Sequence, residues 1–268
     1  MTSRVGTVIV GVLLVAGAAA AADGGVVLEI GFGDITPSGS SSASWGWWDP
    51  GKYNAWSVDE DRELGLTDIR VLVPGGEYTV LLDGERYPTL VALGQFTDPN
   101  GGDEVAQRLE HKSVVFDLGF GRRLGPDRRN GVLPWIGVTY LTISEKRQTA
   151  GSDVVERADS DLWGVVVGAD ASITVWKSVD VVGRALFRWA RGTRTADQAT
   201  PDPVGGSQGG TAEVSDSIDH SMWGLDLGLR WNATSRVGVE AGWRLRDRTL
   251  DGGPATFSGP QVKASITF

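Results

Sequence analysis

The most constraining feature of the sequence is a two-residue alternation of apolar and polar side chains in its last forty-eight residues, 221–268. In residues 223–231 every odd position is large and apolar, whereas the even positions are Gly, Asp, Gly and Arg. A period of two is typical of a β-strand with two chemically different faces. The alternation returns in residues 237–246 and 261–268. We therefore predict three consecutive strands at the C-terminal end of the chain.

Alternation alone does not separate a soluble sheet from a membrane barrel, so other features must decide. Trp223 and Trp231 stand at the two ends of one apolar stripe, where an amphipathic ring is favoured at a membrane interface. The opposite, polar faces mix Gly with Arg, Glu and Asp, which suits a crowded barrel interior. The chain also ends on an apolar-x-aromatic tripeptide that contains Ile266 and Phe268. Together these features favour a membrane barrel.

The C-terminal residues resemble the last strand of bacterial outer-membrane β-barrel proteins, whose terminal aromatic residue helps the assembly machinery to recognise the chain. Gln261 fits the polar start of that signal, whereas Lys263 stands where Gly is usual. The resemblance is to small barrels of the opacity and porin-like kind, and it covers most of the mature chain. It implies that Ile266 and Phe268 form an assembly signal. It also implies an integral protein of the cell outer membrane, in contact with outer-membrane lipid and lipopolysaccharide and, during biogenesis, with the barrel-assembly machinery.

Residues 1–22 have the pattern of a secretory signal peptide: Arg4, an apolar stretch in residues 5–18, and three alanines before Asp23. The apolar stretch is shorter than the roughly 20 residues that a spanning helix needs. We therefore expect residues 23–268 to form one outer-membrane barrel domain. The chain has no Cys and a net charge of −9, which excludes disulfides and argues against nucleic acid as a partner. No cofactor and no metal site is expected.

Connections between the expected strands alternate in length. Those after residues 124, 176 and 231 are short, whereas residues 146–160 and 192–220 read as polar loops and the connection after residue 247 is also longer. Outer-membrane barrels have short periplasmic turns and longer extracellular loops. The alternation therefore orients the seven strands that follow residue 109.

The N-terminal part adds the remaining strands. Residues 26–34 alternate as a first strand, and residues 36–64 read as a long loop. Residues 68–73 and 78–82 form a predicted hairpin, and residues 84–96 either continue its second strand across a break or form a separate short strand. The predicted fold is an all-β, antiparallel, up-and-down transmembrane barrel, with ten strands favoured and eight as the alternative.

The orientation predicts two aromatic girdles. Trp163, Trp189, Trp223 and Trp243 are placed at the outer rim, and Trp135, Trp176 and Trp231 at the periplasmic rim with Phe268. The strand over residues 132–145 has Trp135 and Tyr140 on opposite faces, so its lipid side is left open.

Many charged residues of the predicted strands fall at positions that face the barrel interior. The acids are Glu29, Asp117, Asp170, Asp226 and Glu240, and the bases are Arg184, Arg188, Arg230, Arg244, Arg246 and Lys263. A barrel of eight to ten strands has little interior room, and an unpaired buried charge is very costly. These residues are therefore predicted to line the lumen, either as a structural network or as a narrow pore for small solutes or ions.

Two other function classes were considered. A surface-binding or adhesion barrel would act through its long extracellular loops, and this is the alternative to the structural or pore role. An enzyme would need a nucleophile and a base, and the candidates are His111 near Ser113, and His220 beside Ser221 and Asp219. Neighbouring strand residues such as His220 and Ser221 point to opposite faces. The expectation from the sequence is therefore a barrel without catalytic residues.

Overall fold

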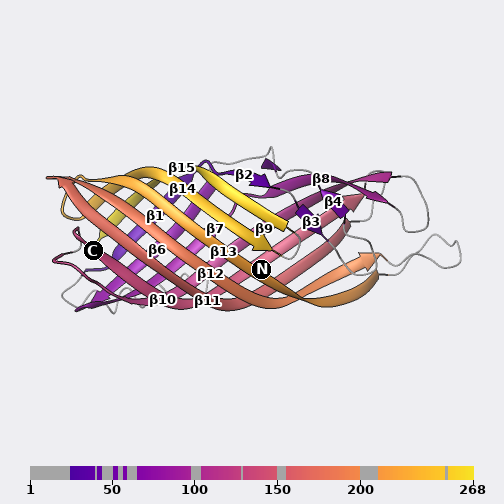
Figure 1. Ribbon diagram of the computed structural model, residues 1–268, viewed down its shortest axis with the longest axis horizontal. Coiled ribbons are helices and arrows are strands. Elements are labelled where there is room, and N and C mark those ends of the chain that lie inside the picture. Colours follow the sequence, from indigo (N-terminus) through magenta and orange to yellow (C-terminus); the bar gives the residue numbers. More distant parts are fainter. Residues whose placement is uncertain are drawn as a thin grey trace, which may run out of the picture.

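The chain folds into a closed antiparallel barrel (Figure 1). The computed structural model describes residues 25–39, 41–43, 51–53, 57–58, 65–97, 104–127, 129–149, 155–199, 211–250 and 253–268. The expected signal peptide, residues 1–22, lies outside these ranges. The wall strands are β1 (Val27–Gly33), β6 (Gly65–Gly75), β7 (Tyr78–Arg86), β9 (Glu104–Arg122), β10 (Gly131–Thr149), β11 (Val155–Trp176), β12 (Val179–Ala199), β13 (Thr211–Asn232), β14 (Val237–Leu250) and β15 (Gly253–Thr267).

Each wall strand pairs with its neighbours in the order β10-β11-β12-β13-β14-β15-β1-β6-β7-β9, and β9 pairs back onto β10. The ring closes between the first and last strands, where Val27 faces Thr267 and the Phe268 N–H donates to the Val26 carbonyl at 2.9 Å. Each of the ten wall strands is thus paired on both sides, as membrane-spanning strands require. The predicted ten-strand barrel is confirmed.

Short strands extend the wall at one end. They are β2 (Thr36–Gly39), β3 (Ser41–Ala43), β4 (Gly51–Tyr53), β5 (Ser57–Val58) and β8 (Leu90–Thr97). β7 and β8 pair with the two halves of β9, with Arg86 opposite Val114 and Leu90 opposite His111. The segment after Gly84 therefore continues the wall across a break at Pro88, which cannot donate a ladder hydrogen bond. Each predicted interpretation is met in part, because the wall does continue along β9, but through the separate short strand β8 and without a break at Gly84.

The short turns are as predicted. β11 and β12 are joined by residues 177–178, and β13 and β14 by residues 233–236. In the β6–β7 turn Gly76 has a φ of 65°, a left-handed conformation that favours glycine. These turns lie together at one end of the barrel.

The structure corrects the long connections that were expected from the sequence. Residues 146–160 and 192–220 belong largely to strands, with Arg147 paired to Glu156 and Thr195 to Ser215. Only residues 251–252 separate β14 from β15. β11, β12 and β13 are 22, 21 and 22 residues long, about twice what a bilayer needs. These strand ends are polar on the outward face and mix polar with apolar residues on the inward face, so the apolar-out, polar-in alternation that marks a membrane strand is missing from them.

The outer surface carries an apolar belt edged by aromatic rings. Trp163, Trp176, Trp189, Trp223, Trp231 and Trp243 are exposed. On β13 the outward face changes from Trp223 to Ser221 and Asp219, so residues before Trp223 lie beyond the belt. On β14 the outward face likewise becomes polar at Asp247. The contact of these rings with lipid stays a prediction.

Trp135 is the exception among the predicted girdle residues, because it faces the interior and is only 4% exposed. Gly119, Gly121 and Gly168 on the neighbouring strands leave room for its indole. Tyr140 takes the outward position on β10, where its ring lies 4.5 Å from that of Trp163. The assignment of Trp135 to the periplasmic girdle is therefore wrong.

The described residues include no helix long and apolar enough to cross a bilayer.

Candidate functional site

The barrel interior contains a charged layer, to which nine of the ten wall strands contribute. We define the charged layer as Glu29, Asp68, Asp83, Glu85, Asp117, Asp170, Asp226 and Glu240 with Arg70, Arg184, Arg188, Arg230, Arg244, Arg246 and Lys263. The eleven residues predicted to line the lumen all face inward here. Only the side chains of Asp170 and Arg230 keep appreciable exposure, 21% and 24%.

Four members of the charged layer were not identified from the sequence: Asp68, Arg70, Asp83 and Glu85. They lie on the β6–β7 hairpin, whose strands were expected but whose inward face was not assigned. The spacing of two within each pair is the signal that places both members on one face.

Arg188 joins opposite sides of the ring. Its guanidinium lies 2.6 Å from the Glu85 carboxylate and 2.6 Å from that of Asp117. β12, which carries Arg188, and β7, which carries Glu85, are four places apart in the ring. This contact therefore crosses the lumen rather than running along the wall.

A second set of contacts crosses the barrel closer to the short β11–β12 and β13–β14 turns. Arg70 donates two hydrogen bonds to Asp170, at 2.8 and 2.6 Å, in the bidentate arrangement that suits a guanidinium and a carboxylate. Arg184 lies 2.9 Å from Asp83 and 3.1 Å from Asp170. Arg230 bridges Glu29 and Glu240 at 2.8 and 2.9 Å.

Asp226 accepts from three cations, Arg244, Arg246 and Lys263, at 3.2, 2.6 and 3.2 Å. Arg246 also lies 2.7 Å from Glu85, again four places around the ring. Each cation of the charged layer is thus within 4 Å of at least one carboxylate. The layer is a connected network and not a set of separate pairs.

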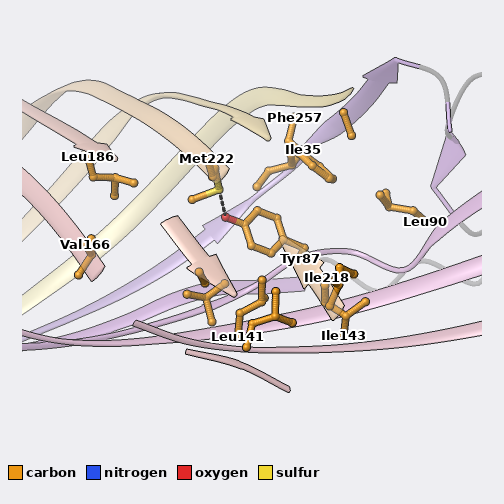
Figure 2. Packing of buried hydrophobic residues seen from close by; sticks show 14 of the residues in the cluster. Ile35, Tyr87, Leu90, Leu141, Ile143, Val166, Leu186, Ile218, Met222 and Phe257 are labelled. Carbon is orange, nitrogen blue, oxygen red and sulfur yellow. Dashed lines mark hydrogen bonds between the residues drawn. The ribbon is translucent and has the colours of Figure 1, made fainter. Parts of the chain in front are cut away.

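Apolar side chains fill the interior on the side of this layer that faces away from the short turns. We call Ile35, Tyr87, Leu90, Leu109, Leu141, Ile143, Ile218, Met222 and Phe257 the outer apolar cluster. Figure 2 shows Tyr87 at its centre, with its hydroxyl 3.0 Å from the Met222 sulfur and its ring 5.2 Å from that of Phe257. Tyr87 follows β7, and Met222 lies on β13 on the opposite side of the ring.

On the side of the layer that faces the short turns lies a cavity of about 70 Å³. Its polar lining comes from the charged layer itself, including Glu29, Arg70, Arg184 and Lys263. The cavity has room for about two water molecules.

A second polar group lies beyond the belt, next to the outer apolar cluster. We call His111, Ser113, Glu145, His220 and Arg248 the outer polar cluster, and all five are buried. His111 Nδ1 is 3.1 Å from Glu145 Oε1. Arg248 donates to Ser113 Oγ at 3.2 Å, and its guanidinium lies 4.8 Å from the centre of the Phe257 ring.

Burial, together with the positive charges of Arg248 and Arg188, lowers the pKa of His220 to about 3. Burial also lowers the pKa of His111, although Glu145 opposes this shift. Both imidazoles are therefore neutral at pH 7. Of the two predicted catalytic groupings, His220 is not assembled with Ser221 and Asp219, because those two side chains point outward. His111 and Ser113 share the inward face.

Within the described part of the chain, no group of three or more His, Asp or Glu side chains is positioned to hold a metal ion.

Solved structures share this fold. The outer membrane protease OmpT from Escherichia coli superposes with a TM-score of 0.60 at 11% sequence identity, over 91% of this chain and 97% of that chain. The transport unit of the autotransporter AIDA-I from Escherichia coli is also similar, at 10% identity, 92% and 91% coverage and a TM-score of 0.43. No protein-family model and no curated protein matches the sequence. The chain has the fold of an outer-membrane β-barrel protein.

A closed ring of ten strands with an outward apolar belt belongs in a bilayer, and the outer membrane is the place of barrels with this fold. The expectation that the chain is not an enzyme is corrected by the first of these matches, because OmpT has the same fold and is a protease. The architecture therefore gives no ground for excluding catalysis.

Proposed function

We propose that the protein is a closed, non-conducting outer-membrane barrel in which the charged layer braces the wall from inside. The observation that carries the proposal is the set of contacts that cross the lumen, above all Arg188 to Glu85 and Arg70 to Asp170. These residues belong to strands four places apart. The contacts therefore occupy the path that a solute would take.

The chemistry of the interior favours a brace over a pore. A water-filled pore keeps its charges hydrated, so its side chains have no need to meet across the lumen. In the charged layer every cation instead has a carboxylate within 4 Å, and hydrogen bonds in such a low-dielectric setting reinforce one another. The outer apolar cluster adds a second, water-poor barrier, with Tyr87 and Met222 in contact across the ring.

The test is single-channel recording on the refolded full chain in planar bilayers. We expect no discrete conductance steps at moderate voltage. Arg188→Ala is expected to lower stability and to leave the bilayer current at baseline. Arg191→Ala is the matched control, because Arg191 lies on the outer face, 62% exposed. Regular, ion-selective steps from the unmodified protein would overturn the closed-barrel proposal.

A hydrolytic role is the second candidate, and the contact between His111 and Glu145 favours it. In such an enzyme Glu145 would orient the imidazole, His111 would accept the hydroxyl proton of Ser113, and the Ser113 oxygen would attack an acyl carbon. A fluorophosphonate probe tests this role, because an activated serine displaces its fluoride and becomes labelled. Labelling that is lost in Ser113→Ala and kept in Ser221→Ala would support the role. Absence of labelling in the unmodified protein would exclude it.

A further inference from the structure

Arg248 differs from the other inward cations of the barrel. It lies two residues after Arg246 on the same face of β14 and is only 2% exposed. The seven cations of the charged layer each have a carboxylate within 4 Å, whereas Arg248 has none among the residues that the structure describes. Among the described residues its guanidinium has no carboxylate at salt-bridge distance, and the attraction of Glu145, which is itself in contact with His111, reaches it only from further away.

The contacts of Arg248 compensate its charge only in part. One nitrogen donates to Ser113 Oγ at 3.2 Å, and the Nε hydrogen has no acceptor. The Phe257 and Tyr87 rings lie 4.8 and 6.0 Å away, within the range of cation–π attraction. His220 faces the same region, and its buried Nδ1 is also without a hydrogen-bond partner.

The charge of Arg248 is not removed by deprotonation. Burial lowers its pKa only to about 10, so the guanidinium stays charged at neutral pH. An uncompensated charge in such a place is strongly destabilising. An anion that accepted hydrogen bonds from the guanidinium would relieve that cost, and such charge-assisted bonds are among the strongest in proteins.

We propose that Arg248, Ser113 and His220 form a binding site for the oxyanion group, carboxylate or phosphate, of a ligand that enters from the extracellular end. Arg248, Ser113 and His220 can each donate a hydrogen bond, which suits an anion, whereas the Glu145 carboxylate of the same cluster is in contact with His111. The charged layer blocks the periplasmic route, whereas the β14–β15 connection at residues 251–252 is only three residues beyond Arg248. Ile218 and Phe257 line the same interior and would contact an apolar part of the ligand. This site does not depend on either proposed function.

Thermal unfolding of the folded full chain in detergent tests the site, with sodium acetate or sodium phosphate compared with sodium chloride at equal ionic strength. A ligand that binds only the folded state raises the midpoint, and we expect a saturable rise of roughly 2–4 °C. The rise should disappear in Arg248→Met and persist in Arg191→Met. A response to acetate identifies a carboxylate site, and a response to phosphate identifies a phosphate site. No response to either anion, or an equal response in Arg248→Met, would overturn the proposal.

A second variant keeps Arg248 and adds a negatively charged side chain of the protein next to it. Ser113→Asp places a carboxylate beside the guanidinium, so it should raise the unfolding midpoint and abolish the response to added anions. Ser113→Asn is the matched neutral control and should do neither. If Ser113→Asp lowers the midpoint as much as Ser113→Asn or more, Arg248 has no need of an anionic partner and the proposal is wrong.

Discussion

Arg188 and Glu85 are 103 residues apart in the sequence, yet their side chains meet inside the barrel at 2.6 Å. The contact holds β12 and β7 at a fixed separation across the lumen. Glu85 also accepts from Arg246, and Arg188 also donates to Asp117, so the pair is the centre of a wider network. The brace therefore depends on residues that no local segment of the chain brings together.

Removal of Arg188 should be one of the most damaging single changes in the barrel. Arg188→Met leaves Asp117 without its cation and Glu85 with Arg246 as its remaining close cation, and breaking a buried pair in this way costs about 3–5 kcal/mol. The free energy of unfolding in urea, measured in lipid vesicles, gives the value. Arg191→Met removes an exposed pair with Asp219 and should cost less than about 1 kcal/mol.

A double-mutant cycle separates the Arg188–Glu85 contact from general damage. Glu85→Gln should cost less in the Arg188→Met background than in the unmodified protein, because the contact has already been lost. Equal costs in both backgrounds would show that the two side chains do not stabilise each other.

The orientation of the barrel is tested by labelling on intact cells. Ser217 is exposed on the outer face of β13 beyond the belt, and Ser178 lies in the β11–β12 turn. With the turns in the periplasm, Ser217→Cys should react with a membrane-impermeant maleimide and Ser178→Cys should react only after permeabilisation. The chain has no native Cys to interfere. Reaction at Ser178→Cys alone on intact cells would reverse the orientation.

The parts of the fold that alternation could predict are those within the apolar belt. Residues 223–231 face outward with one set of side chains and into the lumen with the other, so their two faces differ and the strand is visible in the sequence. Beyond the belt the outward face is polar too, as at Thr193 and Thr195 on β12, and the inward face mixes polar residues such as Arg194 with apolar ones such as Ile218 on β13, so the apolar-out, polar-in alternation disappears. That is why residues 192–220 were expected to be a loop.

The candidate site was only partly predictable for a different reason. The two-residue alternation along each strand was enough to place Arg184, Arg188 and Asp226 on the inward face, because it depends only on the sequence of that strand. The partners of these residues depend on the closure of the ring, which places Glu85 opposite Arg188. Trp135 was misplaced because the glycines that admit its ring, such as Gly168, belong to other strands.

The inward position of Trp135 predicts a severe effect at a neighbouring glycine. A Cβ at Gly168 would overlap the indole of Trp135, so Gly168→Ala should destabilise the barrel by about 1–3 kcal/mol. Trp135→Leu in the same chain should restore part of the loss by making room. Gly75 in the β6–β7 turn has open space around it, and Gly75→Ala is the control. A Gly168→Ala barrel as stable as the control would argue that Trp135 faces outward after all.

The C-terminal residue should matter for assembly more than for stability. The Phe268 ring is 65% exposed, and its backbone N–H donates to Val26 at the seam of the barrel. Phe268→Ala keeps that backbone bond and removes only the ring. We expect slower assembly in cells, followed by heat-modifiable gel mobility, with unchanged stability once refolded in detergent. Assembly at the normal rate would show that Phe268 is not part of an assembly signal.

The buried imidazole of His220 predicts a loss of stability in mild acid. Its pKa is about 3 in the folded chain because of burial and the charges of Arg248 and Arg188, whereas an ordinary His titrates near 6.5. Below pH 6.5 the unfolded chain takes up a proton that the folded chain does not, so the free energy of unfolding falls as the pH falls. Between pH 7 and pH 5 the loss from this group is at most about 2 kcal/mol.

Urea unfolding at pH 7, 6 and 5 measures this loss, above the range in which ordinary carboxylates titrate. His220→Asn cannot take up the proton and should therefore show a smaller decrease in stability between pH 7 and pH 5 than the unmodified protein. The remaining decrease should come mainly from His111, which is also buried and whose pKa is also lowered despite its contact with Glu145. His111→Asn added to His220→Asn should reduce the decrease further. An equal pH dependence in the single variant and the unmodified protein would mean that His220 is hydrated, which is incompatible with its place beside Arg248 in a dry interior.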